Sequence, residues 1–216
     1  MSHQVYVVED HSVMREGYIA LVDREMDLDI CGETASAREA LHEIPEVKPD
    51  LAIVDLSLEQ GSGLELIKDL RAQGEELKIL VVSMHDEGLY AQRALNAGAE
   101  GYLTKREPSS KVVEAIRQIL DGRMYFSEGI NEQMILRYLG NNSEKVPSLV
   151  GELSDRELEV FEYIGRGLTT REIAEELQLS PKTIGTYRSR VKDKLAIDSN
   201  AELRRRAVIW VELSGV

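Results

Sequence analysis

Short apolar runs alternate five times with amphipathic stretches in the first 121 residues, and this alternation restricts the fold more than any other feature of the sequence. Strands buried on both faces read as continuous apolar runs, and the repeating units are too short for a barrel of eight. We therefore expect an α/β domain with a five-stranded, doubly wound parallel sheet. The expected strands are 5–8, 28–31, 51–54, 78–83 and 101–104, and the expected helices are 12–23, 35–44, 63–72, 87–97 and 109–121.

The second half of the chain has a different pattern. Residues 122–149 are read as a linker with one weak helix near 129–139, because Asn, Ser and Pro follow that helix. Residues 150–216 hold helical patterns without a strand signal, so we expect a small all-α domain of four helices. These helices are expected at 154–165, 170–177, 181–195 and 199–213.

Charge is distributed unevenly between the two halves. Residues 1–147 carry 15 basic and 27 acidic side chains, whereas residues 180–206 carry eight basic and three acidic ones. An acidic front half and a locally basic tail indicate two modules with different partners. The longest apolar runs fall far below the roughly 18 residues of a membrane span, so no membrane partner is expected. No secretion signal is visible and the single cysteine, Cys31, agrees with a reducing compartment, so the protein is expected in the cytoplasm.

Polar residues stand where the expected strands end. In an open parallel sheet, ligands gather outside the carboxyl ends of the strands. Carboxylates packed together there repel one another unless a divalent cation neutralises them, and oxygen ligands favour Mg2+. The chain's four histidines show no spacing typical of a metal site. The strand-end residues are Glu9, Asp10, Asp55, Ser83 and Lys105.

Each strand-end residue also has a simpler interpretation. A single Asp after a strand is commonly a helix cap or a turn residue, a single Lys is commonly a solvated charge, and a single Ser is commonly a loop hydroxyl. Their joint placement favours chemistry, because a carboxylate can attack phosphorus when cations offset the charge of the transferring group.

This set of residues, in a chain of five β/α repeats, resembles the receiver domain of bacterial two-component response regulators over about residues 3–121. The resemblance implies a flavodoxin-like fold and makes Asp55 the acceptor of phosphate from a sensor histidine kinase. It implies a Mg2+ ion held by Glu9, Asp10, Asp55 and the main-chain carbonyl of Ser57. Lys105 and Ser83 would bind the phosphate, and Ser83 and Tyr102 would form the conformational switch; without the family, Tyr102 is equally a packed aromatic on an edge strand.

One position departs from the receiver pattern. Many receivers carry Pro four residues after the phosphoacceptor, and Glu59 stands there in this chain, whereas Gly63 matches. The substitution affects the loop beside the site without removing a ligand. Ser57 and His85 flank the approach of water in such domains and are expected to influence the hydrolysis of the phosphate.

The basic tail contains the pattern of a helix-turn-helix. Ser180 followed by Pro181 is typical of a helix start, and the helix that follows has an apolar stripe and a polar, basic outer face. A bundle with a solvated basic face is the simpler alternative. The segment 153–211 resembles the LuxR-type helix-turn-helix, with Glu157, Gly167, Glu172, Ser180 and Leu195 at matching places. Its expected DNA contacts are Lys182, Thr183, Thr186, Arg188, Ser189, Arg190 and Lys192, and its expected dimerisation residues are Ala201, Leu203, Ala207 and Val208.

The two resemblances together indicate a regulator of the NarL/FixJ class, which is not an enzyme beyond its own phosphorylation and dephosphorylation. The expected partners are a sensor histidine kinase, promoter DNA and a second copy of the chain when phosphorylated. The main alternative is a Mg2+-dependent phosphotransferase or phosphatase with an aspartyl-phosphate intermediate. Against it, Ser57 stands where a general acid would be needed. A binding module with a vestigial receiver is a third possibility.

Overall fold

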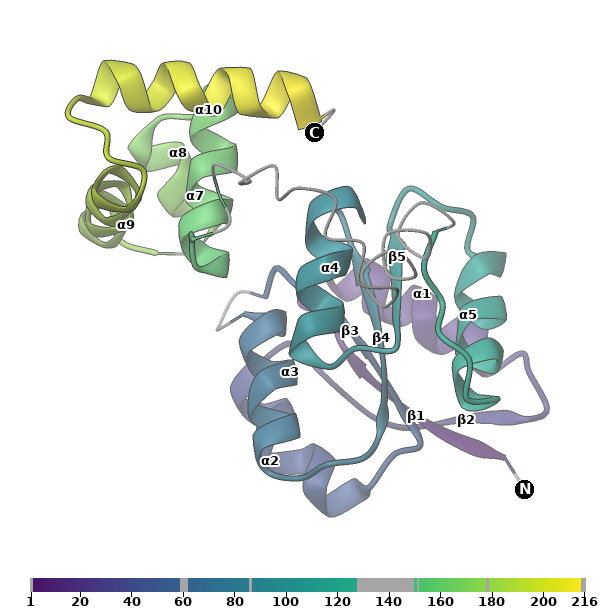
Figure 1. The fold of residues 1–216 in the computed structure, drawn as a ribbon. Helices are drawn as coiled ribbons and strands as arrows, with labels where there is room; N and C mark the ends of the chain where they lie inside the picture. The colour runs from purple at the N-terminus through teal and green to yellow at the C-terminus, as the bar shows by residue number, and fades with distance from the viewer. Residues whose placement is uncertain are drawn as a thin grey trace, which may run out of the picture. The chain divides into compact units, whose positions relative to one another are not determined.

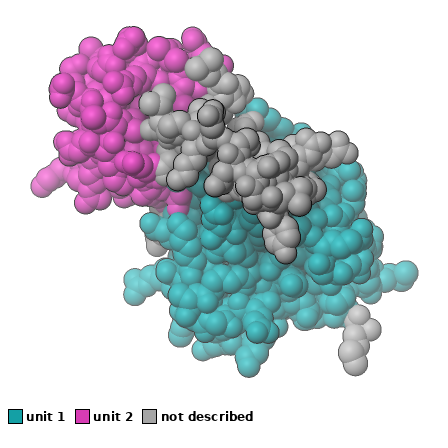
Figure 2. Space-filling model, in the orientation of Figure 1, with its two compact units in different colours: residues 1–135 teal, residues 136–216 magenta. Residues whose placement is uncertain are grey.

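The structure is a computed structural model that describes residues 2–58, 62–85, 87–127, 150, 152–177 and 179–214. The chain divides into two compact units, residues 1–135 and 136–216, which Figure 2 shows in different colours. Glu59 and the expected weak helix at 129–139 lie outside the described residues. Within the described part of the chain, no helix combines the length and the apolar character needed to cross a membrane.

The first unit contains a five-stranded sheet in which every pair of neighbouring strands is parallel, in the order β2-β1-β3-β4-β5. From β1 the chain first adds β2 on one side and then adds β3, β4 and β5 on the other side. This reversal makes the sheet doubly wound, as predicted. The strands are β1 (His3–Val8), β2 (Leu28–Thr34), β3 (Leu51–Val54), β4 (Lys78–Ser83) and β5 (Gly101–Thr104).

Helices cover both faces of this sheet (Figure 1). On one face, α1 and α5 bury apolar side chains such as Val22 and Ile116 against Val7, Ile53 and Leu80 of the strands. The helices α2, α3 and α4 lie on the other face. Because both faces are covered, the central strands carry continuous apolar runs, such as Leu51–Val54 of β3 and residues 79–82 of β4. The helices are α1 (Ser12–Val22), α2 (Ala37–Val47), α3 (Gly63–Ala72), α4 (Glu87–Ala97) and α5 (Ser110–Leu120).

Two elements extend beyond their expected ends. β2 continues through Gly32, Glu33 and Thr34, because it is an edge strand that pairs with β1 after a shift in register between Val5 and Tyr6. Gly32 is required there, since a Cβ atom would lie 2.5 Å from the Tyr6 ring. α2 continues through Pro45 to Val47, so this proline, which has no amide hydrogen to donate, lies in the last turn and does not end the helix.

The second unit consists, in its described part, of α7 (Asp155–Gly165), α8 (Thr170–Glu176), α9 (Pro181–Lys194) and α10 (Asn200–Ser214). Ser154 and Thr169 each form a capping box with the Glu three residues later, so α7 and α8 begin at fixed positions. Ser180 accepts a hydrogen bond from the Thr183 amide, and Pro181 occupies the first turn of α9. The predicted small all-α domain is confirmed, and these caps set the tight turn between α8 and α9.

Candidate functional site

Three predicted site residues meet at the carboxyl ends of β1, β3 and β5. The Lys105 Nζ lies 2.8 Å from Asp55 Oδ2 and 2.7 Å from Glu9 Oε2. All three side chains are buried: the exposed fraction is 4% for Lys105, 2% for Asp55 and 1% for Glu9. The structure therefore brings an ammonium group and two carboxylates together, although 96 positions separate Glu9 from Lys105 in the sequence.

The backbone holds these residues as extensions of the sheet. The amides of Glu9, Asp55 and Lys105 donate hydrogen bonds to Thr34, Val8 and Ser83 on the neighbouring strands, at 3.0, 2.9 and 2.8 Å. Gly63 is needed beside them, since a Cβ atom at that position would collide with the Asp55 carbonyl oxygen. The site is thus built on the rigid sheet edge and on one close backbone approach.

The electrostatics of the site oppose ionisation of its acids. Burial raises the pKa of Asp55, Asp10 raises it further, and Lys105 counteracts part of the effect. Burial and the neighbouring Asp55 carboxylate likewise raise the pKa of Glu9. Burial lowers the pKa of the Lys105 ammonium, but the Asp55 and Glu9 carboxylates outweigh it and hold the pKa above its usual value. The single Lys105 ammonium group therefore does not offset the cost of ionising both buried carboxyl groups.

A divalent cation fits these residues. The Asp55 Oδ1 atom is buried and has no hydrogen-bond partner among the described residues. Glu9, Asp10, His11 and Asp55 each offer a donor atom, and these atoms lie within 4.8 Å of one another. A buried carboxylate oxygen without a donor, in a cluster of oxygen ligands, is the environment that Mg2+ relieves. The acidic cluster is compatible with Mg2+ binding.

The other predicted residues of the first unit form a hydrogen-bonded network around His85. The buried Ser83 hydroxyl accepts the His85 amide at 3.3 Å, and Tyr102 donates its hydroxyl to the His85 carbonyl oxygen at 2.9 Å. The His85 Nε2 atom lies 2.9 Å from the Ser57 hydroxyl, and its ring stacks on Tyr90. Ser83, Ser57 and Tyr102 are therefore linked through one histidine, and Tyr102 is 1% exposed.

Sequence reasoning missed two residues at this site. His11 lies against Asp10, with 2.8 Å between Nδ1 and Oδ1. Arg15 donates from Nη1 to the Glu9 carbonyl oxygen at 2.8 Å and from Nε to Glu33 at 3.0 Å, so it ties the end of β1 to β2. The position of His11 directly after the acid pair was the available signal, whereas the contacts of Arg15 depend on the fold.

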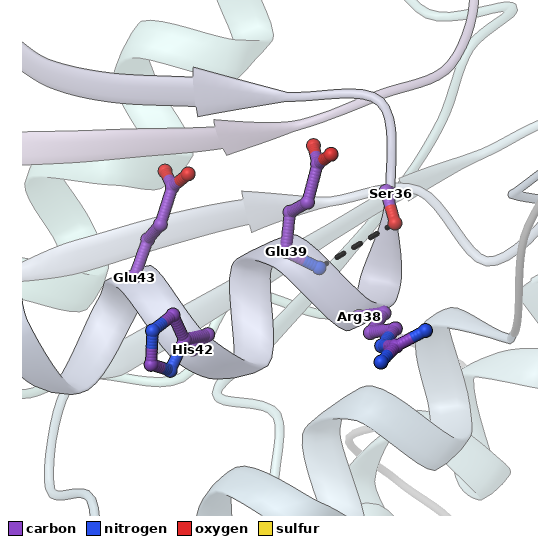
Figure 3. A pocket seen from close by; sticks show the side chains of 5 residues that line it. All are labelled: Ser36, Arg38, Glu39, His42 and Glu43. Atoms are coloured by element: carbon purple, nitrogen blue, oxygen red, sulfur yellow. Dashed lines mark hydrogen bonds between the residues drawn. The ribbon is translucent and has the colours of Figure 1, made fainter.

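A shallow pocket along α2 is a separate feature (Figure 3). None of its lining residues belongs to the acidic cluster. Its acids already have partners, because Glu39 accepts the Thr34 hydroxyl at 2.6 Å and Glu43 accepts the Tyr6 hydroxyl at 2.6 Å. The pocket therefore takes no part in the candidate site. It is lined by Ser36, Arg38, Glu39, His42 and Glu43.

The predicted DNA contacts lie on α9, which buries Ile184 and Val191 in its own unit. Thr183 serves the helix cap, Lys192 is half-buried, and the half-buried Arg188 donates from Nη1 to the Thr170 hydroxyl on α8 at 3.2 Å. The remaining predicted contacts form an exposed polar face: Lys182, Thr186, Ser189 and Arg190.

The predicted dimerisation residues occupy different faces of α10. Leu203 and Ala207 are fully buried, and a Cβ atom at Gly165 would collide with the Ala207 carbonyl oxygen, so this face packs on α7. Ala201 is exposed and Val208 half-buried, and the exposed Ile209 lies beside Val208. A second chain can therefore contact Ala201, Val208 and Ile209 more readily than the two buried residues.

The fold and the acidic site define a receiver-type domain, and the second unit is a helix-turn-helix. Residues 5–117 match the family described as response regulator receiver domain, and residues 151–207 match the bacterial regulatory proteins of the luxR family. The chain belongs to the two-component response regulators of the NarL/FixJ class, whose members are DNA-binding transcription regulators.

Similar proteins cover nearly the whole chain. BvgA of Bordetella pertussis, a transcription regulator of virulence factors, is 32% identical over 94% of this chain and 95% of its own. The response regulator GacA of Pseudomonas aeruginosa is 33% identical over 95% of both chains. RcsB of Salmonella enterica, solved on promoter DNA with the phosphomimetic BeF3-, has a TM-score of 0.62 at 21% identity, over 96% of this chain and 98% of that one. The RcsB likeness concerns the fold alone.

Proposed function

We propose that this protein is a phosphorylation-switched transcription regulator in which Asp55 accepts a phosphoryl group from a sensor histidine kinase. The observation that carries the proposal is the placement of Asp55, which is buried, contacts Lys105 at 2.8 Å and keeps one oxygen without a hydrogen-bond partner among the described residues. Most buried polar atoms in proteins have a hydrogen-bond partner, so this oxygen requires an explanation that the ion pair with Lys105 alone does not give.

In the proposed transfer, a carboxylate oxygen of Asp55 attacks the phosphorus of a phosphohistidine. The new O–P bond forms as the P–N bond breaks, and the histidine nitrogen leaves with the electron pair of that bond. Lys105 would orient the transferring group by ion pairing. Glu9, Asp10, Asp55 and the Ser57 carbonyl would hold Mg2+. When bound, the ion would offset the charge of the carboxylates and of the phosphoryl group.

The phosphate would act on the rest of the molecule through Ser83 and Tyr102. A phosphoryl group adds charge and acceptor oxygens. The Ser83 hydroxyl, which accepts the His85 amide, would instead donate to the phosphate, and Tyr102 would leave the His85 carbonyl. Because both contacts meet at His85, one event can shift the equilibrium between two arrangements of the loop after β4.

The second unit would bind promoter DNA through the exposed face of α9, as a dimer when phosphorylated. The basic side chains of Arg188, Arg190 and Lys192 suit phosphate contacts, and Lys182, Thr186 and Ser189 suit contacts to base edges. Thr183, at the start of the helix, completes the predicted set of contacts. The dimer would form through α10, with Ala201 and Val208 in the contact and with Leu203 and Ala207 supporting the helix from the core of the unit.

The remaining expectations belong to the same proposal. The domains would span residues 1–121, 122–149 as a linker, and 150–216. The protein would act in the cytoplasm and without a membrane partner. Its only reactions would be its own phosphorylation and dephosphorylation, because Ser57 offers no acid for a phosphatase cycle.

Incubation with acetyl phosphate and Mg2+ tests the proposal. Intact-mass measurement should show one added phosphoryl group on the full-length protein, and omission of Mg2+ should abolish it. Asp55→Asn should prevent the addition, whereas Asp50→Asn, an exposed acid that precedes the same strand, should not. A wild-type protein without the adduct, or an Asp55→Asn variant that still acquires it, would refute the assignment of Asp55.

A further inference from the structure

His11 forms the solvent side of the acidic cluster. Its backbone amide donates to Glu9 Oε1 at 3.2 Å. Its ring Nδ1 lies 2.8 Å from Asp10 Oδ1 and 3.3 Å from Glu9 Oε1, although 72% of the side chain is exposed. The imidazole is therefore directed at the two acids that end β1, and not away into solvent.

The cluster consequently offers nitrogen as well as oxygen. The donor atoms of Glu9, Asp10, His11 and Asp55 lie within 4.8 Å of one another, close enough to reach one ion. An independent sign of a missing ligand is the buried Asp55 Oδ1, which has no hydrogen-bond partner in the described part of the chain. Three carboxylates and an imidazole are more protein ligands than Mg2+ usually takes, because this ion is commonly bound by one or two carboxylates and keeps several waters.

Divalent ions respond differently to an imidazole. Mg2+ prefers oxygen ligands and keeps several waters, so a nearby histidine adds little to its binding. Co2+ and Zn2+ bind imidazole well, and they exceed Mn2+ in affinity for nitrogen and oxygen donor sets. A histidine beside three acids should therefore strengthen the binding of Co2+ and Zn2+ much more than the binding of Mg2+.

We propose that His11 is a ligand that the acidic site uses for Co2+ and Zn2+ but not for Mg2+, so that such ions compete with Mg2+ at the phosphoacceptor. Coordination through Nδ1 would leave the ring proton on the exposed Nε2. The inference rests on the proposed function in one respect, because it takes the acids as a divalent-cation site. The rival interpretation is that His11 only orients Asp10 by hydrogen bonding, which would affect all ions alike.

The test is calorimetric titration of the metal-free, full-length protein with Mg2+, Co2+ and Zn2+ in separate experiments. His11→Ala should weaken Co2+ and Zn2+ binding by at least the roughly 10-fold that loss of even an outer-shell partner costs, and change Mg2+ binding less than about two-fold. The visible absorption spectrum of the Co2+ form should also shift on loss of the nitrogen ligand. His42→Ala, an exposed histidine on α2, is the matched control and should change none of these.

The outcomes separate this inference from the proposed function. Equal weakening of the binding of all three ions by His11→Ala, or no weakening at all, overturns the role of His11 as a ligand without removing the Mg2+ site. Co2+ binding that persists unchanged in Asp55→Asn lies elsewhere and overturns the role as well. A wild-type protein that binds none of the three ions removes the metal site itself, and with it both proposals.

Discussion

At the scale of single residues, Asp55 and Glu9 give the acidic site a characteristic dependence on pH. Burial raises the pKa of both carboxyl groups. The Asp10 carboxylate raises the pKa of Asp55 further, and the Asp55 carboxylate raises that of Glu9. The metal-free folded state therefore binds more protons than the unfolded chain above a pH of about 4, where unfolded carboxyl groups titrate. Their contribution to stability is present below that pH and is lost as pH rises through the raised folded-state pKa.

The first prediction compares wild type with Asp55→Asn in EDTA. The variant should be about as stable as wild type near pH 4 and should become more stable above it, by on the order of 1 kcal/mol at pH 7.5, since it removes a desolvated and repelled charge. Urea unfolding between pH 4 and 8 measures this difference. Acids whose pKa is lowered in the folded state, such as Glu157 and Glu202, contribute equally to the pH dependence of both proteins. Their contribution therefore cancels in the comparison.

Saturating Mg2+ provides the control, because a divalent cation favours the ionised carboxylates. It should stabilise wild type at pH 7.5 and stabilise Asp55→Asn less. If the difference in unfolding free energy between the two proteins did not change with pH, the folded state would not raise the pKa of Asp55 as the structure indicates.

The same residues show what the sequence can predict at this scale. Glu9, Asp55 and Lys105 could be placed together because each follows a continuous apolar run, and parallel strands end at one edge. The order of the strands was not needed for that step. His11 was not assigned, because its one signal is its position directly after the acid pair, and that position alone is not a spacing typical of a metal site. The role of Arg15 depends on β2, whose end was misplaced.

At the scale of secondary-structure elements, the buried strands and the capped helices were predicted closely, and the failures have local causes. The sequence Gly32-Glu33-Thr34 is polar, and only its pairing with β1 at the edge of the sheet makes it a strand. Pro45 indicates a helix end, yet α2 carries it in the last turn, and Lys48 then ends the helix in a left-handed conformation with a φ of 53°. The local sequence pattern does not reveal the pairing of residues 32–34 with β1 or the position at which α2 ends.

The second prediction concerns Gly185 in α9. This residue is exposed, and among the described residues an added Cβ would meet no atom within 4 Å beyond its chain neighbours and the backbone of its own helix. Gly185→Ala should therefore stabilise the second unit by about 1 kcal/mol, the difference in helix propensity between the two residues. Thermal unfolding measures the effect. Because the new methyl group lies beside Thr186 on the proposed DNA-binding face, the affinity for a specific promoter site should fall while non-specific binding is retained.

Gly17→Ala is the matched control. Gly17 is an exposed glycine within α1 of the first unit, also with no atom within 4 Å of an added Cβ. It should stabilise its own unit by a similar amount and leave DNA binding unchanged. If Gly185→Ala stabilised the protein without changing its preference among DNA sequences, α9 would not read base edges at this position.

At the scale of the whole molecule, the two units differ in charge in a way that suits their partners. The chain has a net charge of −13, yet residues 180–206 carry eight basic and three acidic side chains. An acidic protein is repelled by DNA except where such a surface is presented, so attraction should be confined to the second unit. Under the proposed function, phosphate at Asp55 would change DNA affinity only by favouring one arrangement of the chain over another.

The last prediction is the salt dependence of binding to promoter fragments that the protein selects from genomic DNA. Arg190→Ala combined with Lys192→Ala should reduce the steepness of the plot of log affinity against log salt by about 2 for each bound chain, because each lost phosphate contact removes about one released ion. Arg24→Ala combined with Arg38→Ala removes two exposed charges from the first unit and should leave the slope unchanged. Acetyl phosphate should raise the affinity of wild type and not of Asp55→Asn. An unchanged slope in the α9 variant would move the DNA contact to another face, and equal affinity with and without the phosphodonor would remove phosphate as the switch.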